Sequence, residues 1–174
     1  MMAMELRLPA AGDAIAALLR RLWANTQAMA TSFKVEVLNG IHALGTSVVR
    51  AGTGADTIKA ALYLASATMN ASTTAYSATG EVSGTGYSAG GVTVTNATPP
   101  TSSGTTAYWT PSASFVWGPP VTLASAFDAV LLYNSTQANK AISVHTFGSQ
   151  TITAGTFTLT MPTNDASNAL LRVA

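Results

Sequence analysis

The feature that most constrains the fold of this chain is a glycine-rich stretch that leads directly into an alternating strand. Residues 80–98 end in the run Gly-Gly-Val-Thr-Val-Thr-Asn-Ala-Thr. Apolar and polar side chains alternate there with period 2, which is the pattern of a half-buried strand. We therefore expect Val92 and Val94 on one face of this strand, with Thr93 and Thr95 on the other.

Glycines ahead of that strand predict tight turns or bulges. Gly84, Gly86, Gly90 and Gly91 are expected to adopt positive φ angles, because residues with a Cβ do so only at a steric cost. A turn of this kind in mid-chain is typical of an all-β domain.

Further strands are predicted on both sides of the glycine-rich turn. Residues 127–133, Phe-Asp-Ala-Val-Leu-Leu-Tyr, form the most hydrophobic segment and are expected near the centre of a sheet. Residues 57–65 form an apolar strand of the kind that is buried in a sandwich. The other expected strands are 33–38, 105–109, 112–117, 141–147, 151–153, 157–161 and 169–173. Eight or more short strands, spaced about ten residues apart, predict a mainly β fold, a β-sandwich or jelly roll.

Turns and loops are predicted where glycine, proline or polar residues separate these strands. Pro111 lacks a ladder donor, so the join between residues 105–109 and 112–117 is expected to be an edge or a bulge. Gly118-Pro119-Pro120 is expected to end this hairpin-like region. Gly148 and Gly155 are expected to be turns between short strands, and residues 68–79 and 162–168 to be loops.

The segment around Asn39-Gly40 has two interpretations. The alternation in residues 33–38 predicts a strand, and Asn39-Gly40 then suits a two-residue hairpin turn. A helix over residues 37–49 competes with this, with Leu38, Ile41, Ala43 and Leu44 on its apolar face. The sequence leaves the choice open.

The N-terminal residues form an amphipathic pattern rather than a β pattern. Asp13 is a natural helix N-cap, and the helix is expected to run to about Ala28. We expect residues 1–28 to be an arm that docks on its own sheet or on a neighbouring subunit, and residues 29–174 to be the β-sandwich domain; alternatively, the natural chain starts at Met29. The apolar face, which is the first candidate interface, consists of Ile15, Leu18, Leu19, Leu22 and Trp23.

Composition indicates a protein that works inside an assembly. Charged residues make up 9% of the chain, against roughly 25% in average soluble domains, whereas serine and threonine supply about a quarter of all positions. A freely diffusing domain usually relies on charge for solubility, although a secreted β protein with an uncharged surface remains an alternative. The net charge is +1, so neither nucleic acid nor an acidic membrane is an expected partner.

Residues able to perform catalysis are few. The chain has seven carboxylates, two histidines and no cysteine, and neither His42 nor His145 has the spacing of a metal-binding motif. Gly84-Thr85-Gly86 lacks the lysine and the helix of a phosphate-binding loop. We therefore expect no enzymatic activity, metal, cofactor or small-molecule substrate, and a structural role for both histidines.

An aromatic cluster is expected between residues 108 and 117. It comprises Tyr108, Trp109, Phe115 and Trp117, flanked by proline-containing turns. Such clusters usually lie in the core. Because tryptophan and tyrosine are also enriched at interface hot spots, Tyr108, Trp109 and Trp117 form the second candidate interface.

The run from Glu81 to Val92, Glu-Val-Ser-Gly-Thr-Gly-Tyr-Ser-Ala-Gly-Gly-Val, resembles small virion proteins of tailed bacteriophages. A looser resemblance extends from residues 56–63 to residues 155–160. It implies a β-rich structural protein of the phage particle, made in the host cytoplasm.

Within that class, the expected function is that of a capsid cement or decoration protein. Such a protein binds the outside of the capsid and ties major capsid protein subunits together, and it is expected to form a homo-oligomer, a dimer or trimer. One alternative is a tail, baseplate or head-fibre component. An alternative of another class is a carbohydrate-binding β-sandwich in which Tyr108, Trp109 and Trp117 stack on sugar rings.

Overall fold

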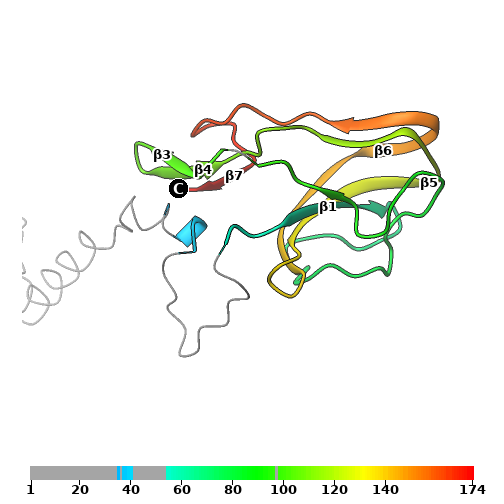
Figure 1. Ribbon diagram of the computed structural model, residues 1–174, viewed down its shortest axis with the longest axis horizontal. Helices are drawn as coiled ribbons and strands as arrows, with labels where there is room; N and C mark the ends of the chain where they lie inside the picture. Colours follow the sequence, from blue (N-terminus) through cyan, green and yellow to red (C-terminus); the bar gives the residue numbers. More distant parts are fainter. Residues whose placement is uncertain (1–34, 36, 41–53, 97) are drawn as a thin grey trace, which may run out of the picture.

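The computed structural model describes residues 35, 37–40, 54–96 and 98–174, and these form a mainly β structure with two antiparallel sheets (Figure 1). This confirms the predicted fold class. The expected arm, residues 1–28, lies outside the described residues. The strands are β1 (Ile58–Leu64), β2 (Val92–Thr93), β3 (Thr101–Ser103), β4 (Thr106–Trp109), β5 (Phe115–Asn134), β6 (Lys140–Leu159) and β7 (Leu171–Val173).

The larger sheet has the strand order β2-β1-β5-β6. β1 pairs with the second half of β5, with Ala61 opposite Leu131. Both segments were predicted as buried strands, and both contain consecutive residues that are almost inaccessible to solvent. The prediction that residues 127–133 lie near the centre of a sheet is therefore confirmed, since β5 lies between β1 and β6.

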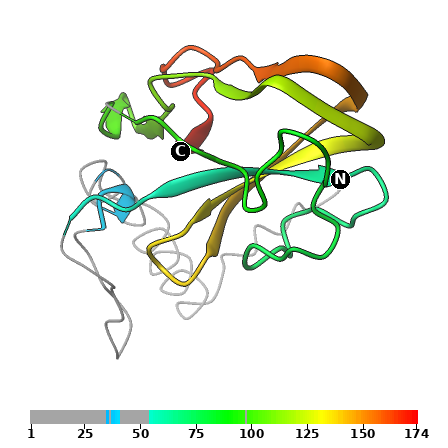
Figure 2. The ribbon, with the colours of Figure 1, turned by 45° about the vertical axis from the view of Figure 1, so that its right-hand side comes forward.

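The β5–β6 hairpin bends back on itself and so forms both layers of the sandwich (Figure 2). Phe147 and Phe157 lie on the same strand, yet their ring centroids are 5.5 Å apart. Ten residues of straight strand would separate them by roughly 33 Å. Consequently the first half of β5 and the second half of β6 cover the sheet formed by β1 and the other two halves.

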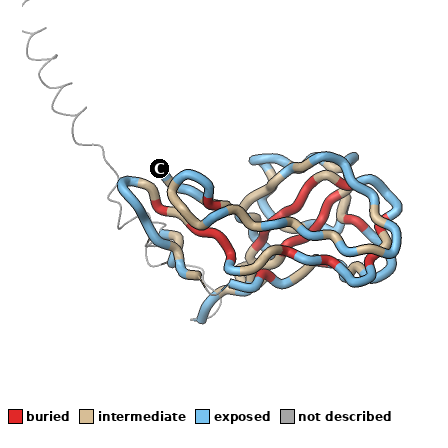
Figure 3. The backbone as a smooth tube through the Cα atoms, turned by 90° about the horizontal axis from the view of Figure 1, so that it is seen from above, coloured by how far each residue is buried: buried red, intermediate tan, exposed pale blue. Residues whose placement is uncertain are grey.

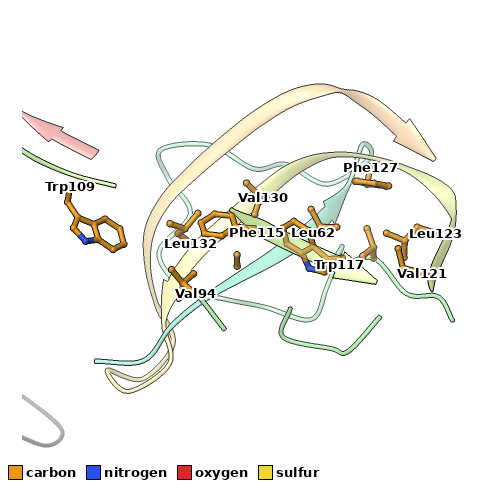
Figure 4. Packing of buried hydrophobic residues seen from close by; sticks show 12 residues of the cluster. Leu62, Val94, Trp109, Phe115, Trp117, Val121, Leu123, Phe127, Val130 and Leu132 are labelled. Carbon is orange, nitrogen blue, oxygen red and sulfur yellow. The ribbon is translucent and has the colours of Figure 1, made fainter. Parts of the chain in front are cut away.

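The main hydrophobic core fills the space between these layers. Trp117 and Phe157 pair across the hairpin in one layer, and Phe157 also packs edge-on against Phe127, with ring centroids 5.0 Å apart. Figure 4 shows the buried side chains as a row that has Trp109 at one end. The buried members are Ala60, Leu62, Val82, Val94, Trp109, Phe115, Trp117, Val121, Leu123, Phe127, Val130 and Leu132.

A second, smaller core lies on the opposite face of the larger sheet. There Leu131 and Tyr133 of β5 are buried beneath the loop that follows β1. Tyr76 from this loop stacks on Tyr133 with ring centroids 4.7 Å apart. The tube in Figure 3 shows buried stretches enclosed by exposed loops on both sides. The central strands are thus covered on both faces, which explains their continuous apolar sequence.

Two positions in the glycine-rich stretch have no room for a side chain. Gly91 has φ of 72°, and a Cβ there would lie 1.9 Å from the carbonyl oxygen of Ala60. At Gly84 the prediction of a positive φ was wrong, since Gly84 is not among the positive-φ residues. What requires glycine at that position is close approach, because a Cβ would lie 2.0 Å from the Thr122 carbonyl oxygen. The alternation is confirmed, with Val94 buried and Thr93 and Thr95 exposed.

The strand predicted over residues 33–38 is wrong. Val35, Val37 and Leu38 are helical, and the amide of Asn39 donates to the Val35 carbonyl at 2.9 Å. Gly40 has φ of 70° and bonds back to Val37, so Asn39-Gly40 ends a helical turn rather than forming a hairpin. Residues 41–49 of the competing helix lie outside the described residues.

The predicted breaks at residues 118–120, 148 and 155 are also wrong. β5 continues through Gly118-Pro119-Pro120, and β6 continues through Gly148 and Gly155, so each strand is 20 residues long. The β5–β6 register shifts between Trp117 and Val121 and again before Ala129. These residues therefore bend the strands instead of ending them, and the described chain has seven strands rather than eight or more short ones.

Candidate interaction surface

The carboxylate of Glu81 accepts three hydrogen bonds from residues of the glycine-rich loop and of the segment before it. It accepts hydrogen bonds from the hydroxyls of Tyr76 (2.6 Å) and Tyr87 (2.8 Å) and from the amide of Gly90 (2.7 Å). The Tyr87 hydroxyl also accepts from the amide of Leu62 in β1 at 3.0 Å. Burial and the neighbouring Glu81 charge raise the pKa of Tyr76 and Tyr87, so both phenols stay protonated. This Glu81 network fastens the glycine-rich loop to β1.

His145 lies on β6 beside Ser143. Its Nε2 atom is 2.9 Å from the Ser143 hydroxyl oxygen, and the pair borders a cavity of about 610 Å³ between β6 and residues 166–174. Burial lowers the pKa of the His145 imidazole, which keeps it neutral at pH 7. No hydrogen bond to a carboxylate is seen at this imidazole among the described residues.

Within residues 35, 37–40, 54–96 and 98–174, no three metal-ligating side chains gather at one place. A helix long and apolar enough to cross a bilayer is not found in these ranges either.

One layer of the sandwich carries no charged residue on either strand. We define this neutral layer as residues 115–126 of β5 and 148–159 of β6. Val116 and Thr158 lie opposite each other in the ladder, and the Val116 side chain is 44% exposed. The outer face is built from small, hydroxyl or apolar residues, and its other exposed members include Pro119, Pro120, Ala124, Ser125, Thr151, Thr153 and Thr156.

The neutral layer offers a large uncharged surface for a protein partner. Interface cores are depleted in charged residues relative to the rest of a protein surface. Burying this face removes no ion from water, so the desolvation cost is limited to hydroxyl groups, the Gln150 amide and backbone groups that a partner can hydrogen-bond. Charged side chains of the described chain lie elsewhere, on β1, on the second half of β5, at the start of β6, and in loops and β7.

The sequence-predicted interface residues fall into three groups. Ile15, Leu18, Leu19, Leu22 and Trp23 lie outside the described residues. Trp109 and Trp117 are 6% and 2% exposed and belong to the hydrophobic core. Because buried indoles cannot stack on sugar rings, the structure gives no aromatic platform for the carbohydrate-binding alternative at these two positions. Tyr108 is partly exposed on β4 and remains a candidate contact residue.

Trp109 has a structural role that explains its position. Its indole nitrogen donates to the carbonyl oxygen of Thr98 at 3.0 Å and to the side chain of Asn96 at 3.2 Å. β4 belongs to the smaller sheet, whose order is β3-β4-β7. Trp109 therefore inserts from this sheet into the end of the main core and joins the two sheets.

The neutral layer was not predicted as an interaction site from the sequence. The available signal was the distribution of charge: residues 82–127 and 141–164 contain no aspartate, glutamate, lysine or arginine. Without the fold, these two uncharged segments could not be assigned to adjacent strands of one layer.

No protein-family model matches the chain, and no curated protein or solved structure shows significant similarity to it.

Proposed function

We propose that this chain is a structural protein of a phage particle that binds the outer capsid surface and ties major capsid protein subunits together. The observation that carries this proposal is the neutral layer, an exposed face of a β-sandwich without a single charged side chain. A surface of this kind suits permanent burial against protein better than free diffusion. The resemblance of residues 81–92 to tailed-phage virion proteins supports the same class.

Binding of this type would stabilise the shell without chemical reaction. A ligand that binds the assembled state but not the separated subunits shifts the equilibrium toward assembly by mass action. Specific protein interfaces bury roughly 800 Å² on each partner, and the neutral layer has two strands of about twelve residues each from which to draw that area. In this proposal the chain needs no cofactor, nucleic acid, membrane or small-molecule substrate.

Co-sedimentation with capsid shells that lack this protein tests the proposal. The wild-type chain should bind the shells saturably. Thr158→Lys places a charge on the exposed face of the neutral layer, opposite Val116, and should weaken binding at least tenfold, because a buried unpaired charge costs more than about 1.4 kcal/mol. Ser102→Lys is the matched control, since Ser102 is exposed on β3 in the smaller sheet.

Two results would contradict the proposal. One is the absence of saturable binding of the wild-type chain to shells. The other is equal binding by Thr158→Lys and wild type when both have the same thermal midpoint. Labelling the protein in images of whole particles separates a capsid position from a tail, baseplate or head-fibre position.

A further inference from the structure

The two edges of the larger sheet are the two-residue strand β2 and the 20-residue strand β6. Beyond β1, the chain continues the sheet through β2, through the bridge between Tyr63 and Glu81, and through the Val82 amide, which donates to Leu62. β6 forms the other edge. In the described part of the chain, its outer side has a partner only at the start, where Lys140 forms an isolated bridge with Ala75.

An open edge strand presents unpaired amides and carbonyls to any other chain. Natural proteins commonly protect such edges with charged side chains, prolines, bulges or a covering loop. Residues 141–159 of β6 contain no proline and no charged residue, and none of the 20 residues in β6 is fully buried. This edge is therefore suited to pairing with another strand.

The first half of β6 is the part with the geometry for pairing. From Ser143 to Thr146 the ladder to β5 is regular, with Ser143 opposite Leu132 and Thr146 opposite Ala129. One register shift, between Leu132 and Tyr133, lies at Ile142. The second half is less suitable, because four further shifts lie beyond Thr146 and Ala154 adopts a left-handed φ of 47°. Bulges of this kind twist an edge away from regular pairing.

We propose that residues 142–146 of β6 pair antiparallel with the same residues of a second copy of this chain, with Val144 at the centre and Ile142 opposite Thr146 of the other copy. A two-fold antiparallel pairing brings each strand against its own sequence, so it is favourable only where that sequence does not repel itself. Residues 142–146, Ile-Ser-Val-His-Thr, are uncharged apart from the imidazole. Burial keeps that imidazole neutral at pH 7. Ile142, which is 37% exposed, would gain an apolar contact across the new edge.

This pairing deepens the proposed function and rests on it for its biological meaning. A dimer formed through β6 carries two identical neutral layers, one for each of two capsid subunits. Two linked binding surfaces attach to two capsid subunits more tightly than either surface attaches alone. Because five paired residues bury less than a standard interface, the free dimer should be weak, with a dissociation constant on the order of 10–100 μM.

Sedimentation velocity across a concentration series tests the pairing. Wild type should shift from monomer to dimer as the concentration rises. Ile142→Lys/Thr146→Lys places lysines opposite each other in the antiparallel pair and should weaken dimerisation at least tenfold, as should Ile142→Glu/Thr146→Glu. An equimolar mixture of the two double variants should restore the dimer, because the opposed charges then attract. Thr158→Lys, on the irregular half of β6, is the control that should still dimerise.

A wild-type chain that stays monomeric at millimolar concentration overturns the pairing. So does a double variant with unchanged folding that dimerises like wild type, or a mixture that fails to restore the dimer. The two proposals fail separately: shell binding with no dimer refutes only the pairing, whereas a β6 dimer that binds no shell refutes only the capsid function.

Discussion

The hydroxyl of Tyr87 donates to the carboxylate of Glu81 at 2.8 Å while it accepts the amide of Leu62 at 3.0 Å. One phenol thus connects the glycine-rich loop to the central strand β1. The geometry explains why a carboxylate occurs within an otherwise uncharged loop, since it accepts three donors that would lack a partner there.

Replacing Glu81 with glutamine should destabilise the fold. The amide has one acceptor oxygen and brings two donors toward tyrosine hydroxyls that already donate, so at least one hydrogen bond is lost. Hydrogen bonds to charged groups contribute roughly 1.5–3 kcal/mol each, and we expect a loss of about 2 kcal/mol. Urea unfolding measures it; a loss below about 0.5 kcal/mol would show that the network does not hold the loop.

Gly91→Ala should be more damaging than most glycine substitutions. The added Cβ would meet the Ala60 carbonyl oxygen at 1.9 Å in a left-handed backbone conformation. We expect a loss of roughly 3 kcal/mol or more. Gly148→Ala is the control, because nothing lies within 4 Å of its Cβ position, and it should change stability by less than about 0.5 kcal/mol. Similar thermal midpoints for the two variants would refute the role of close packing at Gly91.

Leu131→Ala should create a cavity at the centre of the larger sheet. Leu131 is fully buried in the smaller core, opposite Ala61. The expected loss of unfolding free energy is roughly 2–5 kcal/mol. Val116→Ala, on the exposed face of the neutral layer, should cost far less. Equal losses from chemical denaturation of the two variants would contradict the burial described for β5.

The pH dependence of stability should contain a contribution from His145. Burial lowers the pKa of its imidazole below the ordinary value of 6.5. The unfolded state therefore binds more protons than the folded state in the window below pH 6.5. By linkage, stability rises with pH across that window and is lost as pH falls through it. His145→Gln should flatten this slope in thermal unfolding between pH 5 and about 7; an unchanged slope would assign the effect to other groups.

The local sequence was sufficient to predict the two buried strands, because a short, continuous apolar run forms few structures other than a buried strand. Residues 58–64 and 127–133 pair with each other as neighbours in the sheet, and both were recognisable from composition alone. The glycines at 148 and 155 misled because glycine also permits a bend inside a continuous strand. The prediction that the strand ends at Pro119 and Pro120 was wrong for a related reason. Both prolines lie where the β5–β6 ladder shifts register, so their missing amide donors cost no regular ladder hydrogen bond.

The candidate surface was harder to predict than the core. A neutral face becomes visible only when the hairpin folds back and places two distant uncharged segments side by side. Likewise, the alternation in residues 33–38 predicts a strand by period, but the Asn39-Gly40 turn gives the local hydrogen bonds that close a helical turn. Long-range strand pairing creates the neutral layer, and local hydrogen bonding determines the helical turn at residues 35–40. The hydrophobic period of the sequence predicts neither of these interactions.

The bend in the β5–β6 hairpin has a mechanical consequence. Both layers of the sandwich contain half of β5 and half of β6, so a force that pulls one layer from the other runs through covalent backbone at the bend. In a sandwich built from separate strands, the same force would be resisted by side-chain packing alone. If the chain bridges capsid subunits as we propose, it would therefore yield first at its docking contacts, leaving the two layers joined.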